Sequence, residues 1–371
     1  MSFAKYAAVI LAAGYSSRMK EFKPLLSIGD QTIADRVISL FQKHDVDVIL
    51  VTGWRSDELV DGITSDTITI AENPDYKKGM LSSIQAGVDH LQSHHRSFFV
   101  MPVDIPLVRE STIRRLLDHT EENPGRIIYP VFDSRRGHPP LITSSLVPDV
   151  LNWSGEGGLD TILASHNHLD LDVPVPDENI LLDADSRDDY VLMLNRYNRM
   201  QIPSNKECES LLDIAGMADN VQRHCRKVAE VAVVMSEAVK AAGKTVDTGL
   251  VRAASLLHDI AKTSSEHDIE GGRILTDFGF GKTGHVVSLH TDVFREGEQP
   301  SLEAMIVYLA DKYIQDEDPV TVEERYSRAE IKYGSIPGVF EKIQRYKRDA
   351  LKVKKHMEMI LGFSPDRIVF C

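Results

Sequence analysis

Short apolar runs alternate with helical patterns through the first half of the chain, and this alternation stops near Ser210. Strands that alternate with helices form parallel sheets covered on both faces, so this half is predicted to be an α/β doubly wound, mostly parallel sheet. The strand-like runs are residues 7–13, 47–53, 67–73, 96–106 and 126–132. The helical patterns between them are residues 32–43, 79–92 and 111–120, the last opening on Ser111 as a cap.

The second half of the chain shows helical spacing and almost no strand pattern. Its helical patterns are residues 220–243, 248–262 and 301–316. A length of 371 residues is too great for one compact core and suits two domains. We therefore expect an α/β domain over residues 1–200, a linker over residues 201–210 and an all-α domain over residues 211–371.

The charge and the cysteine content of the chain limit the classes of partner and the cell compartment that we expect for it. Asp and Glu outnumber Lys and Arg by 56 to 42, which gives a net charge of −14, and so acidic a surface repels nucleic acid. The three cysteines, Cys208, Cys225 and Cys371, show no CxxC spacing and no disulfide framework. No apolar stretch approaches the ~20 residues of a membrane-spanning helix. We expect a cytoplasmic protein with no membrane and no nucleic-acid partner.

Three cations follow the first strand-like run, within the segment LAAGYSSRMKEFKPLL at residues 11–26. Gly14 allows the backbone to approach a ligand closely, and Ser16 can donate a hydroxyl hydrogen bond. Arg18 offers a planar fork to phosphate oxygens, and Lys23 offers a point charge. The segment lacks the Walker A spacing, so these residues alone leave two interpretations: a triphosphate-binding loop, or a surface loop with solvated cations.

Further segments of the first half carry motifs that can be considered together with residues 11–26. They are NPDYKKGMLSSIQAG (73–87), MPVDIPLV (101–108), GHPPLI (137–142), SGEGGLD (154–160) and LDADSRDDY (182–190). Taken in order with residues 11–26, they resemble the signature segments of molybdenum-cofactor nucleotidyltransferases, part of a wider family that also activates sugars and isoprenoid precursors. The resemblance covers roughly residues 5–190 and implies a nucleotide-diphospho-sugar transferase-like fold of the Rossmann type.

The resemblance implies magnesium-dependent nucleotidyl transfer, in which a phosphate of the acceptor attacks the α-phosphorus of a nucleoside triphosphate and pyrophosphate leaves. It places Arg18 and Lys23 on the triphosphate as catalytic cations. Asp104, a further catalytic residue, would bind Mg²⁺ together with Asp185. His138 would face the acceptor. The residues expected at the nucleotide are Leu11, Ala12, Ala13, Gly14, Ser16, Arg18, Lys23, Asn73, Ser82 and Ser83.

Three positions bear on the choice of substrates. Residues 11–14 read LAAG, which resembles the cytidylyl-transferring branch more than the guanylyl-transferring one, so CTP is favoured over other nucleoside triphosphates. Lys20 stands where the family has Gly, and Asp160 stands where the GDxGAR-like turn has Arg. The second change removes a cation from the acceptor side. The resemblance implies a molybdopterin-type acceptor, and a sugar phosphate or another phosphorylated alcohol is the alternative.

The second half carries ligand-type side chains on its apolar helical patterns. His224 lies in phase with the apolar residues of its helix, the pair His258-Asp259 ends a second apolar helix, and Asp311 ends a third. A buried carboxylate is costly unless it is paired or binds a metal. Mixed imidazole and carboxylate ligands suit Mn²⁺, Fe²⁺, Zn²⁺ or Co²⁺, so this pattern predicts a divalent metal centre.

The order of these ligands resembles the H…HD…D pattern of the HD-domain phosphohydrolases, over roughly residues 215–345. EHDIEGGRIL (266–275) and SLHTD (288–292) resemble segments that supply further ligands in that family. The implied metal ligands are His224, His258, Asp259, His267, His290 and Asp311.

The resemblance also implies metal-dependent phosphohydrolysis, with Lys262 on the substrate phosphate as a catalytic residue. Two alternatives stay open at this point. The second half could bind nucleotides without hydrolysing them, or the whole chain could be an inactive carrier of a finished cofactor.

Overall fold

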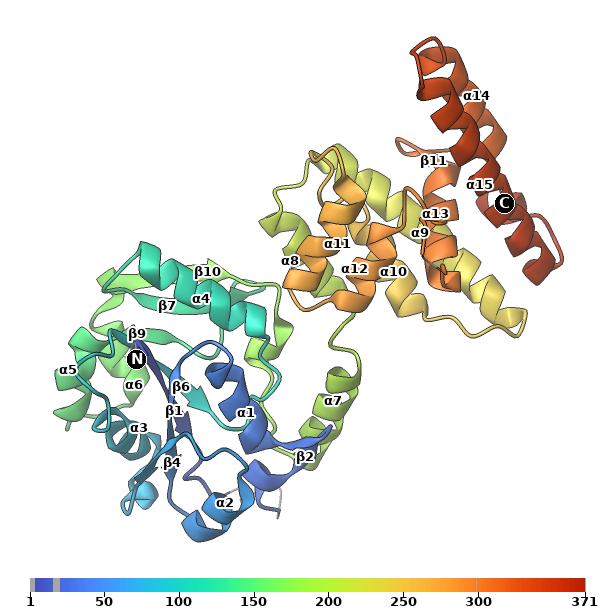
Figure 1. Ribbon diagram of the computed structural model, residues 1–371. Coiled ribbons are helices and arrows are strands. Elements are labelled where there is room, and N and C mark those ends of the chain that lie inside the picture. Colours follow the sequence, from blue (N-terminus) through green and yellow to red (C-terminus); the bar gives the residue numbers. More distant parts are fainter. Residues whose placement is uncertain (1–3, 16–20, 298, 371) are drawn as a thin grey trace. The chain divides into compact units, whose positions relative to one another are not determined.

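The computed structural model describes residues 4–15, 21–297 and 299–370, and its chain divides into two compact units, Met1–Arg199 and Met200–Cys371 (Figure 1). The first unit is a mostly parallel sheet with helices, and the second is helical, which confirms the predicted fold class. The residues expected to link the domains, 201–210, include the first half of helix α8, Asn205–Ile214, in which Cys208 is buried. Ser204 caps this helix by accepting a hydrogen bond from the Glu207 N–H.

The first unit is built on one twisted sheet. Its strands are β1 Tyr6–Leu11, β4 Asp47–Thr52, β5 Thr69–Glu72, β6 Ser97–Pro102, β7 Ile127–Phe132, β8 Arg135–Arg136, β9 Leu141–Thr143 and β10 Asp170–Pro174. They lie in the order β10-β7-β9-β6-β1-β4-β5, with β8 paired to β7. β1 pairs in parallel with β4 and β6, β4 with β5, and β7 with β10. β9 is antiparallel to β6 and β7, and the pair β2 Ser27–Ile28 and β3 Gln31–Thr32 lies apart from the sheet.

Helices cover both faces of this sheet, because alternate strand residues point to opposite sides and both sets are apolar. Val9 of β1 packs in one cluster with Ile84 of α3, and Phe41 of α1 packs against Phe99 of β6 on the other face, with ring centroids 5.2 Å apart. The helices of this unit are α1 Ile33–Gln42, α2 Ser56–Gly62, α3 Met80–Val88, α4 Glu110–Glu122, α5 Val147–Leu151, α6 Leu159–Ala164 and α7 Arg187–Asn198.

The cap predicted for α4 at Ser111 is wrong by two residues. The helix begins at Glu110, and Arg109 is its N-cap without a side-chain cap hydrogen bond. The buried carboxylate of Asp177 takes over this role, since its Oδ2 accepts hydrogen bonds from the Arg109 N–H and the Thr112 hydroxyl, each at 2.8 Å. A partner 65 or more residues away leaves no local signal in the sequence.

The carboxyl ends of the parallel strands bring three segments to one edge of the sheet. The Val103 N–H, just beyond β6, donates to the carbonyl oxygen of Leu11 at the end of β1, at 3.1 Å. The Ala184 N–H donates to the carbonyl oxygen of Asp104 at 3.0 Å. Ligands of open α/β sheets bind at this edge, so the loops after β1 and β6 and the segment before α7 are placed to build a site.

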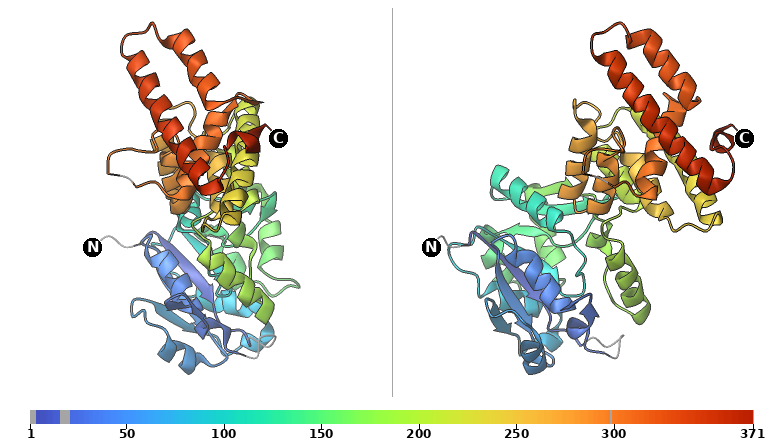
Figure 2. Two further views of the ribbon diagram at one scale, coloured as in Figure 1. Left: turned by 90° about the vertical axis from the view of Figure 1, so that its right-hand side faces the viewer. Right: turned by 45° about the vertical axis from the view of Figure 1, so that its right-hand side comes forward.

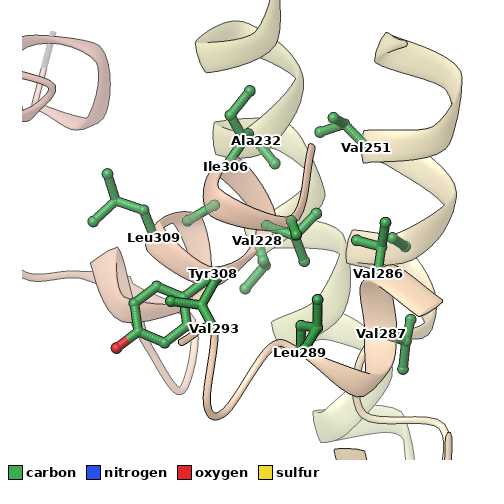
Figure 3. Packing of buried hydrophobic residues seen from close by; sticks show 14 of the residues in the cluster. Val228, Ala232, Val251, Val286, Val287, Leu289, Val293, Ile306, Tyr308 and Leu309 are labelled. Carbon is green, nitrogen blue, oxygen red and sulfur yellow. The ribbon is translucent and has the colours of Figure 1, made fainter. Parts of the chain in front are cut away.

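The second unit packs its helices around an apolar core. The helices that follow α8 are α9 Asp219–Ala241, α10 Thr248–Leu257, α11 His267–Asp277, α12 Gly281–Ser288, α13 Leu302–Tyr313, α14 Val322–Tyr333, α15 Val339–Leu361 and α16 Asp366–Val369. Figure 3 shows side chains from four of these helices packed together, among them Val228 of α9, Val251 of α10, Val286 of α12 and Ile306 of α13. No helix in the described part of either unit has both the length and the apolar character that a membrane crossing needs.

Two hairpins complete the second unit. Helices α14 and α15 run side by side in both views of Figure 2. The helical unit also contains one short strand pair, in which β11 Ile314–Gln315 and β12 Asp318–Pro319 are antiparallel. Its turn contains Asp316 with a φ of 57°, in the left-handed region that Asp tolerates better than most residues. This turn directs the Asp316 carbonyl oxygen to Nδ1 of His224, 2.7 Å away.

Helices α11 and α12 approach each other through two glycines. A Cβ atom on Gly284 of α12 would lie 2.5 Å from the carbonyl oxygen of Gly272 in α11, and a Cβ on Gly272 would lie 2.7 Å from the carbonyl oxygen of Gly284. Both distances are far below van der Waals contact, so only glycine allows this spacing. The pair of helices carries His267 at the start of α11 and His290 just after α12, so the glycine contact sets the distance between these two imidazoles.

We predict that Gly284→Ala destabilises the helical unit by about 1–3 kcal/mol, because the added methyl forces the two backbones apart. Gly281→Ala, in the same helix, is the matched control, since among the described residues its Cβ would meet Gln201 Oε1 alone, at 3.7 Å. It should be neutral or slightly stabilising. Thermal unfolding followed by circular dichroism measures both, and a Gly284→Ala variant as stable as Gly281→Ala would contradict the packing.

Candidate functional site

A buried lysine joins two carboxylates at the edge of the sheet in the first unit. Lys23 Nζ donates to Asp104 Oδ2 at 2.9 Å and to Asp185 Oδ1 at 3.3 Å. Asp104 follows β6 by two residues, and Asp185 precedes Ser186, which caps α7. Two carboxylates from separate segments therefore converge on one positive charge, an arrangement whose oxygen donors also suit Mg²⁺.

The segment expected to bind the nucleotide lies beside this group. Ala12 and Ala13 are buried, and the Ala12 N–H donates to the carbonyl oxygen of Val51 at 2.9 Å. A Cβ on Gly14 would meet none of the described residues within 4 Å. Ser16 and Arg18, predicted to bind phosphate, lie outside the described residues.

Asn73, Ser82 and Ser83, also expected at the nucleotide, bond to one another. Nδ2 of buried Asn73 donates to the hydroxyls of Ser82 and Ser83, each at 3.0 Å, and its Oδ1 accepts from the Asp75 N–H at 2.9 Å. These contacts tie the end of β5 to the first turn of α3. Asn73 therefore orients this turn, and a nucleotide contact from these residues stays a prediction.

A cavity of about 630 Å³ extends from the nucleotide segment to the acceptor-side residues. It is lined by Leu11 of β1, by Met80 and other residues of α3, and by His138 and Asp160. Its volume lies within the range of small-molecule sites. Burial lowers the pKa of His138, whose Nδ1 has no hydrogen-bond partner among the described residues. The structure thus brings His138 and Asp160 to one cavity.

Three further residues of this region were not anticipated from the sequence. Arg136 donates from Nη1 to Asp170 Oδ2 and from Nε to Asp172 Oδ1, each at 2.7 Å. Its guanidinium lies 4.0 Å from the ring centroid of Tyr129. Arg136, Tyr129 and Asp170 line the cavity. They belong to β8, β7 and β10 respectively, and nothing local in the sequence shows that β10 pairs with β7.

The second unit gathers the six metal ligands that were predicted for it in one cluster. Asp311 Oδ1 lies 3.3 Å from Nε2 of His224 and 3.8 Å from Nε2 of His258. Asp259 Oδ1 lies 3.5 Å from Nε2 of His267 and 3.6 Å from Nε2 of His290. Two sets of predicted ligands have their ligand atoms within 4.8 Å of one another, His224, His258 and Asp311 in one and Asp259, His267 and His290 in the other. Cys225, which was not predicted as a ligand, forms a third set with His258 and Asp259.

The imidazoles are held so that Nε2 faces the cluster. Nδ1 lies 2.7 Å from the Asp316 carbonyl oxygen in His224, 2.8 Å from that of Ser255 in His258, and 2.7 Å from that of Val287 in His290. A neutral imidazole that donates from Nδ1 to a carbonyl keeps its lone pair on Nε2. This backbone support is typical of metal-ligating histidines.

Two buried atoms at the centre of the cluster lack hydrogen-bond partners among the described residues: Nε2 of His258 and Oδ1 of Asp259. Burial lowers the pKa of His258 to about 4, so its imidazole is neutral near pH 7. Burial acts to raise the pKa of Asp259, but nearby His258, His290 and Lys262 outweigh it and hold this pKa below its usual value. A neutral imidazole beside an ionised carboxylate is the form in which both bind a divalent metal, so the residues fit one.

Lys312 and Arg325 support Asp311, and the sequence analysis did not single them out. Lys312 Nζ, buried over the Tyr308 ring, donates to Asp311 Oδ2 at 2.6 Å and to the His290 carbonyl oxygen at 3.1 Å. Arg325 donates to the Asp311 carbonyl oxygen at 2.9 Å. Burial acts to raise the pKa of Asp311, but these two cations keep it well below its usual value. Lys312 directly follows Asp311 in an apolar helical pattern, so the sequence could have indicated its role. Nothing in the sequence indicates that Arg325 of α14 reaches Asp311.

A cavity of about 500 Å³ opens onto the cluster. His224, Asp259 and Asp311 line it together with Lys262, whose Nζ lies 2.8 Å from Asp259 Oδ2. The Lys262 side chain is half exposed, so its ammonium stands at the rim between the carboxylate and solvent. The cavity therefore offers ligand atoms at its base and a cation at its opening.

Comparisons with known proteins identify a family for a segment of each unit. The family model of the MobA-like NTP transferase domain matches residues 8–170, and that of the HD domain matches residues 221–316. The molybdenum cofactor cytidylyltransferase of Escherichia coli (strain K12) is 31% identical over 193 residues, which cover 52% of this chain and 97% of that protein. These matches confirm both resemblances that the motifs indicate.

Two further similarities are weaker. A probable molybdenum cofactor guanylyltransferase of Bacillus cereus (strain Q1) is 27% identical over 133 residues, covering 36% of this chain and 64% of that protein. The crystal structure of Rv0371c from Mycobacterium tuberculosis H37Rv aligns with a TM-score of 0.48 and 23% identity, over 53% of this chain and all of that one.

In metal-free protein we predict that His258 titrates near pH 4, since burial disfavours its charged form. The unfolded chain, with a histidine pKa of about 6.5, binds a proton between roughly pH 6.5 and 4 that folded His258 does not. This residue therefore lowers the stability of the helical unit as the pH falls through that window. Imidazole resonances followed by NMR, with His258→Asn to identify the signal, test this; a midpoint at or above about 6.5 would contradict it.

Proposed function

Because the chain belongs to the MobA-like NTP transferase family and carries an HD domain, we propose that it is a bifunctional nucleotide enzyme. The first domain would transfer a nucleotidyl group from a nucleoside triphosphate, CTP being favoured, to a phosphorylated acceptor of the molybdopterin type. The second would be a metal-dependent phosphohydrolase. The convergence of Asp104 and Asp185 on Lys23, beside the cavity of about 630 Å³, is the observation that carries the transferase proposal.

In the first domain, Asp104 and Asp185 would hold Mg²⁺, which when bound neutralises charge on the triphosphate. Lys23, already within 3.3 Å of both carboxylates, would add a positive charge at the same point. Positioning and charge neutralisation supply most of the rate of such reactions. The acceptor phosphate would enter from the cavity and attack the α-phosphorus, and pyrophosphate would leave. Arg18, outside the described residues, stays a predicted second cation.

The choice of CTP and of a molybdopterin-type acceptor rests on the LAAG turn and on the relatives. The relative with 31% identity is a molybdenum cofactor cytidylyltransferase, and the guanylyltransferase shares 27% over a shorter stretch. A sugar phosphate acceptor is the alternative, because Asp160 stands where the resemblance expects a cation.

In the second domain, the unpartnered Nε2 of His258 and Oδ1 of Asp259 support metal binding. Asp259 Oδ1 belongs to the set with His267 and His290, and its Oδ2 lies 3.6 Å from Nε2 of His258 in the set with Asp311. We therefore propose that the cluster holds up to two ions of the Mn²⁺, Fe²⁺, Zn²⁺ or Co²⁺ type. A bound ion would acidify a water into a nucleophile. Lys262, at the rim of the cavity, would hold the phosphate of the substrate against that nucleophile. We place this domain at residues 211–371 and the transferase at residues 1–200.

Asp104→Asn should reduce pyrophosphate release from CTP and a molybdopterin acceptor roughly 100-fold or more, since it removes a charge from the group that holds the triphosphate. Asp183→Asn, an exposed neighbour in the same segment as Asp185, is the matched control and should retain activity. The phosphohydrolase activity of the same preparation reports that the chain is folded. Full transfer by Asp104→Asn would rule out the proposed site.

Asp259→Asn should abolish metal binding in the HD domain, because this carboxylate belongs to the set with His267 and His290 and its Oδ2 lies 3.6 Å from Nε2 of His258 in the set with Asp311. Elemental analysis of the purified chain, and the rise in the unfolding temperature of the helical unit on adding Mn²⁺, measure this without reference to activity. His285→Asn, an exposed histidine on α12, should bind metal as the wild type does. Equal metal content in both variants would contradict the proposal, and a loaded wild type that binds nucleotides without turnover would favour a sensor.

A further inference from the structure

A cavity of about 540 Å³ in the helical unit shares no lining residue with the cavity at the metal cluster. It is formed by α8, α9 and α10, and we call it the α8–α10 groove. Its lining residues recur at helical spacing, at Arg226, Ala229, Glu230 and Val233 on α9 and at Arg252 and Leu256 on α10. One face of each helix is therefore turned toward the groove.

The α8–α10 groove has an apolar floor and a charged rim. Cys208 and Leu212 of α8 line it and are buried, as is Ala229 of α9. Arg226 and Arg252 line it as well, and both are exposed. A volume of this size is typical of sites for small molecules. A ligand that fills the groove would place apolar surface on the floor and its polar group between the two arginines.

Neither arginine of the rim is paired with a carboxylate in the described part of the chain. Arg226 Nη2 donates to Gln222 Oε1 at 3.0 Å. Arg252 forms no hydrogen bond or ion pair with a described residue, although the charge of Glu237 on α9 acts on it from a distance. Other exposed arginines of this unit, such as Arg273, do bond to carboxylates. The rim thus offers two guanidinium groups, which bind anions through their N–H donors.

The acidic residues of the groove limit the charge that a ligand can carry. Glu230 lines the groove, but its Oε2 accepts from Lys227 Nζ at 2.9 Å, so its charge is largely offset. Glu209 of α8 adds a second negative charge. Three cations therefore face two carboxylates, which leaves one positive charge in excess. This balance suits a ligand with a single negative charge better than a polyphosphate.

We propose that the α8–α10 groove binds a small organic monoanion, a carboxylate or sulfonate on an apolar ring system, and that this ligand regulates the metal cluster. Residues two apart on an α-helix point to nearly opposite sides. His224 comes two residues before Arg226, and His258 comes two residues after Leu256. The helices α9 and α10 pack against each other, so a ligand between their outer faces changes the spacing of the two imidazoles on their inner faces. The regulatory part rests on the proposed metal centre, whereas binding of the anion does not.

The fluorescent dye 8-anilinonaphthalene-1-sulfonate, a monoanion with apolar rings, tests the ligand class on the full chain. Wild type should bind it, and Arg226→Gln and Arg252→Gln should each weaken binding about tenfold. Arg273→Gln, an exposed arginine of α11 outside the groove, is the matched control and should change binding less than twofold. Equal affinities in all the variants, or no binding at millimolar concentration, would overturn the inference.

A second measurement needs no variant. N-Phenyl-1-naphthylamine has the same rings without the sulfonate, so wild type should bind it about tenfold more weakly. Equal affinities for the two dyes would show that the apolar floor alone binds them. That result would overturn the assignment of an anion even if the arginine variants fail to fold.

Calorimetric titration with Mn²⁺ tests the regulatory part. A saturating amount of the sulfonate dye should change the Kd of wild type for Mn²⁺ at least about threefold, and Mn²⁺ should change the Kd for the dye by the same factor. The change should disappear in Arg252→Gln. An unchanged Kd for Mn²⁺ would overturn the regulatory role. A chain that binds the dye but no Mn²⁺ would refute the proposed metal centre and leave the anion site standing.

Discussion

The burial of carboxylates governs how the helical unit is built, because a charge removed from water must be matched by opposite charge or by a metal. Asp259 and Asp311 are only 1% and 6% exposed. The groups that face them come from different elements: His224 from α9, His267 from α11 and Arg325 from α14. The helices can pack only in an arrangement that brings these groups together. The close approach of α11 and α12 at Gly272 and Gly284 is one consequence, since it sets the spacing of His267 and His290.

The carboxylates of the first unit also need a compensating charge, but they are less deeply buried. The side chains of Asp104 and Asp185 are 23% and 42% exposed, and a single buried lysine compensates both. Water screens these carboxylates in part, so their neighbours need not be fixed as closely as those of Asp259. A site of this kind suits reactants that enter and leave with each cycle, whereas the enclosed cluster of the second unit suits ions that stay bound.

The sequence was enough to predict those strands, helices and site residues that depend on local periodicity and on the order of the motifs. The alternating runs predicted the strands β1, β4, β5, β6 and β7, and the phase of His224 and Asp311 predicted that their helices meet. It did not reveal contacts that depend on strand or helix pairing across the chain. Arg136 and Asp170 meet only because β8 and β10 both pair with β7, and Asp177 replaces the Ser111 cap from 65 residues away. Arg325 reaches Asp311 because α14 packs against α13. No residue pattern in the sequence predicts this helix contact.

Lys23 shows how one side chain can balance charge in two states of a site. Without nucleotide, its ammonium offsets Asp104 and Asp185, which would otherwise repel each other across a short distance. Under the proposed function, Mg²⁺ would take over these carboxylates and the anionic triphosphate would arrive with it. The ammonium would then leave the two carboxylates and be free to pair with the phosphates. The carboxylates stay oriented before the substrate binds, so little reorganisation opposes the transfer step, which is the condition for electrostatic stabilisation of a transition state.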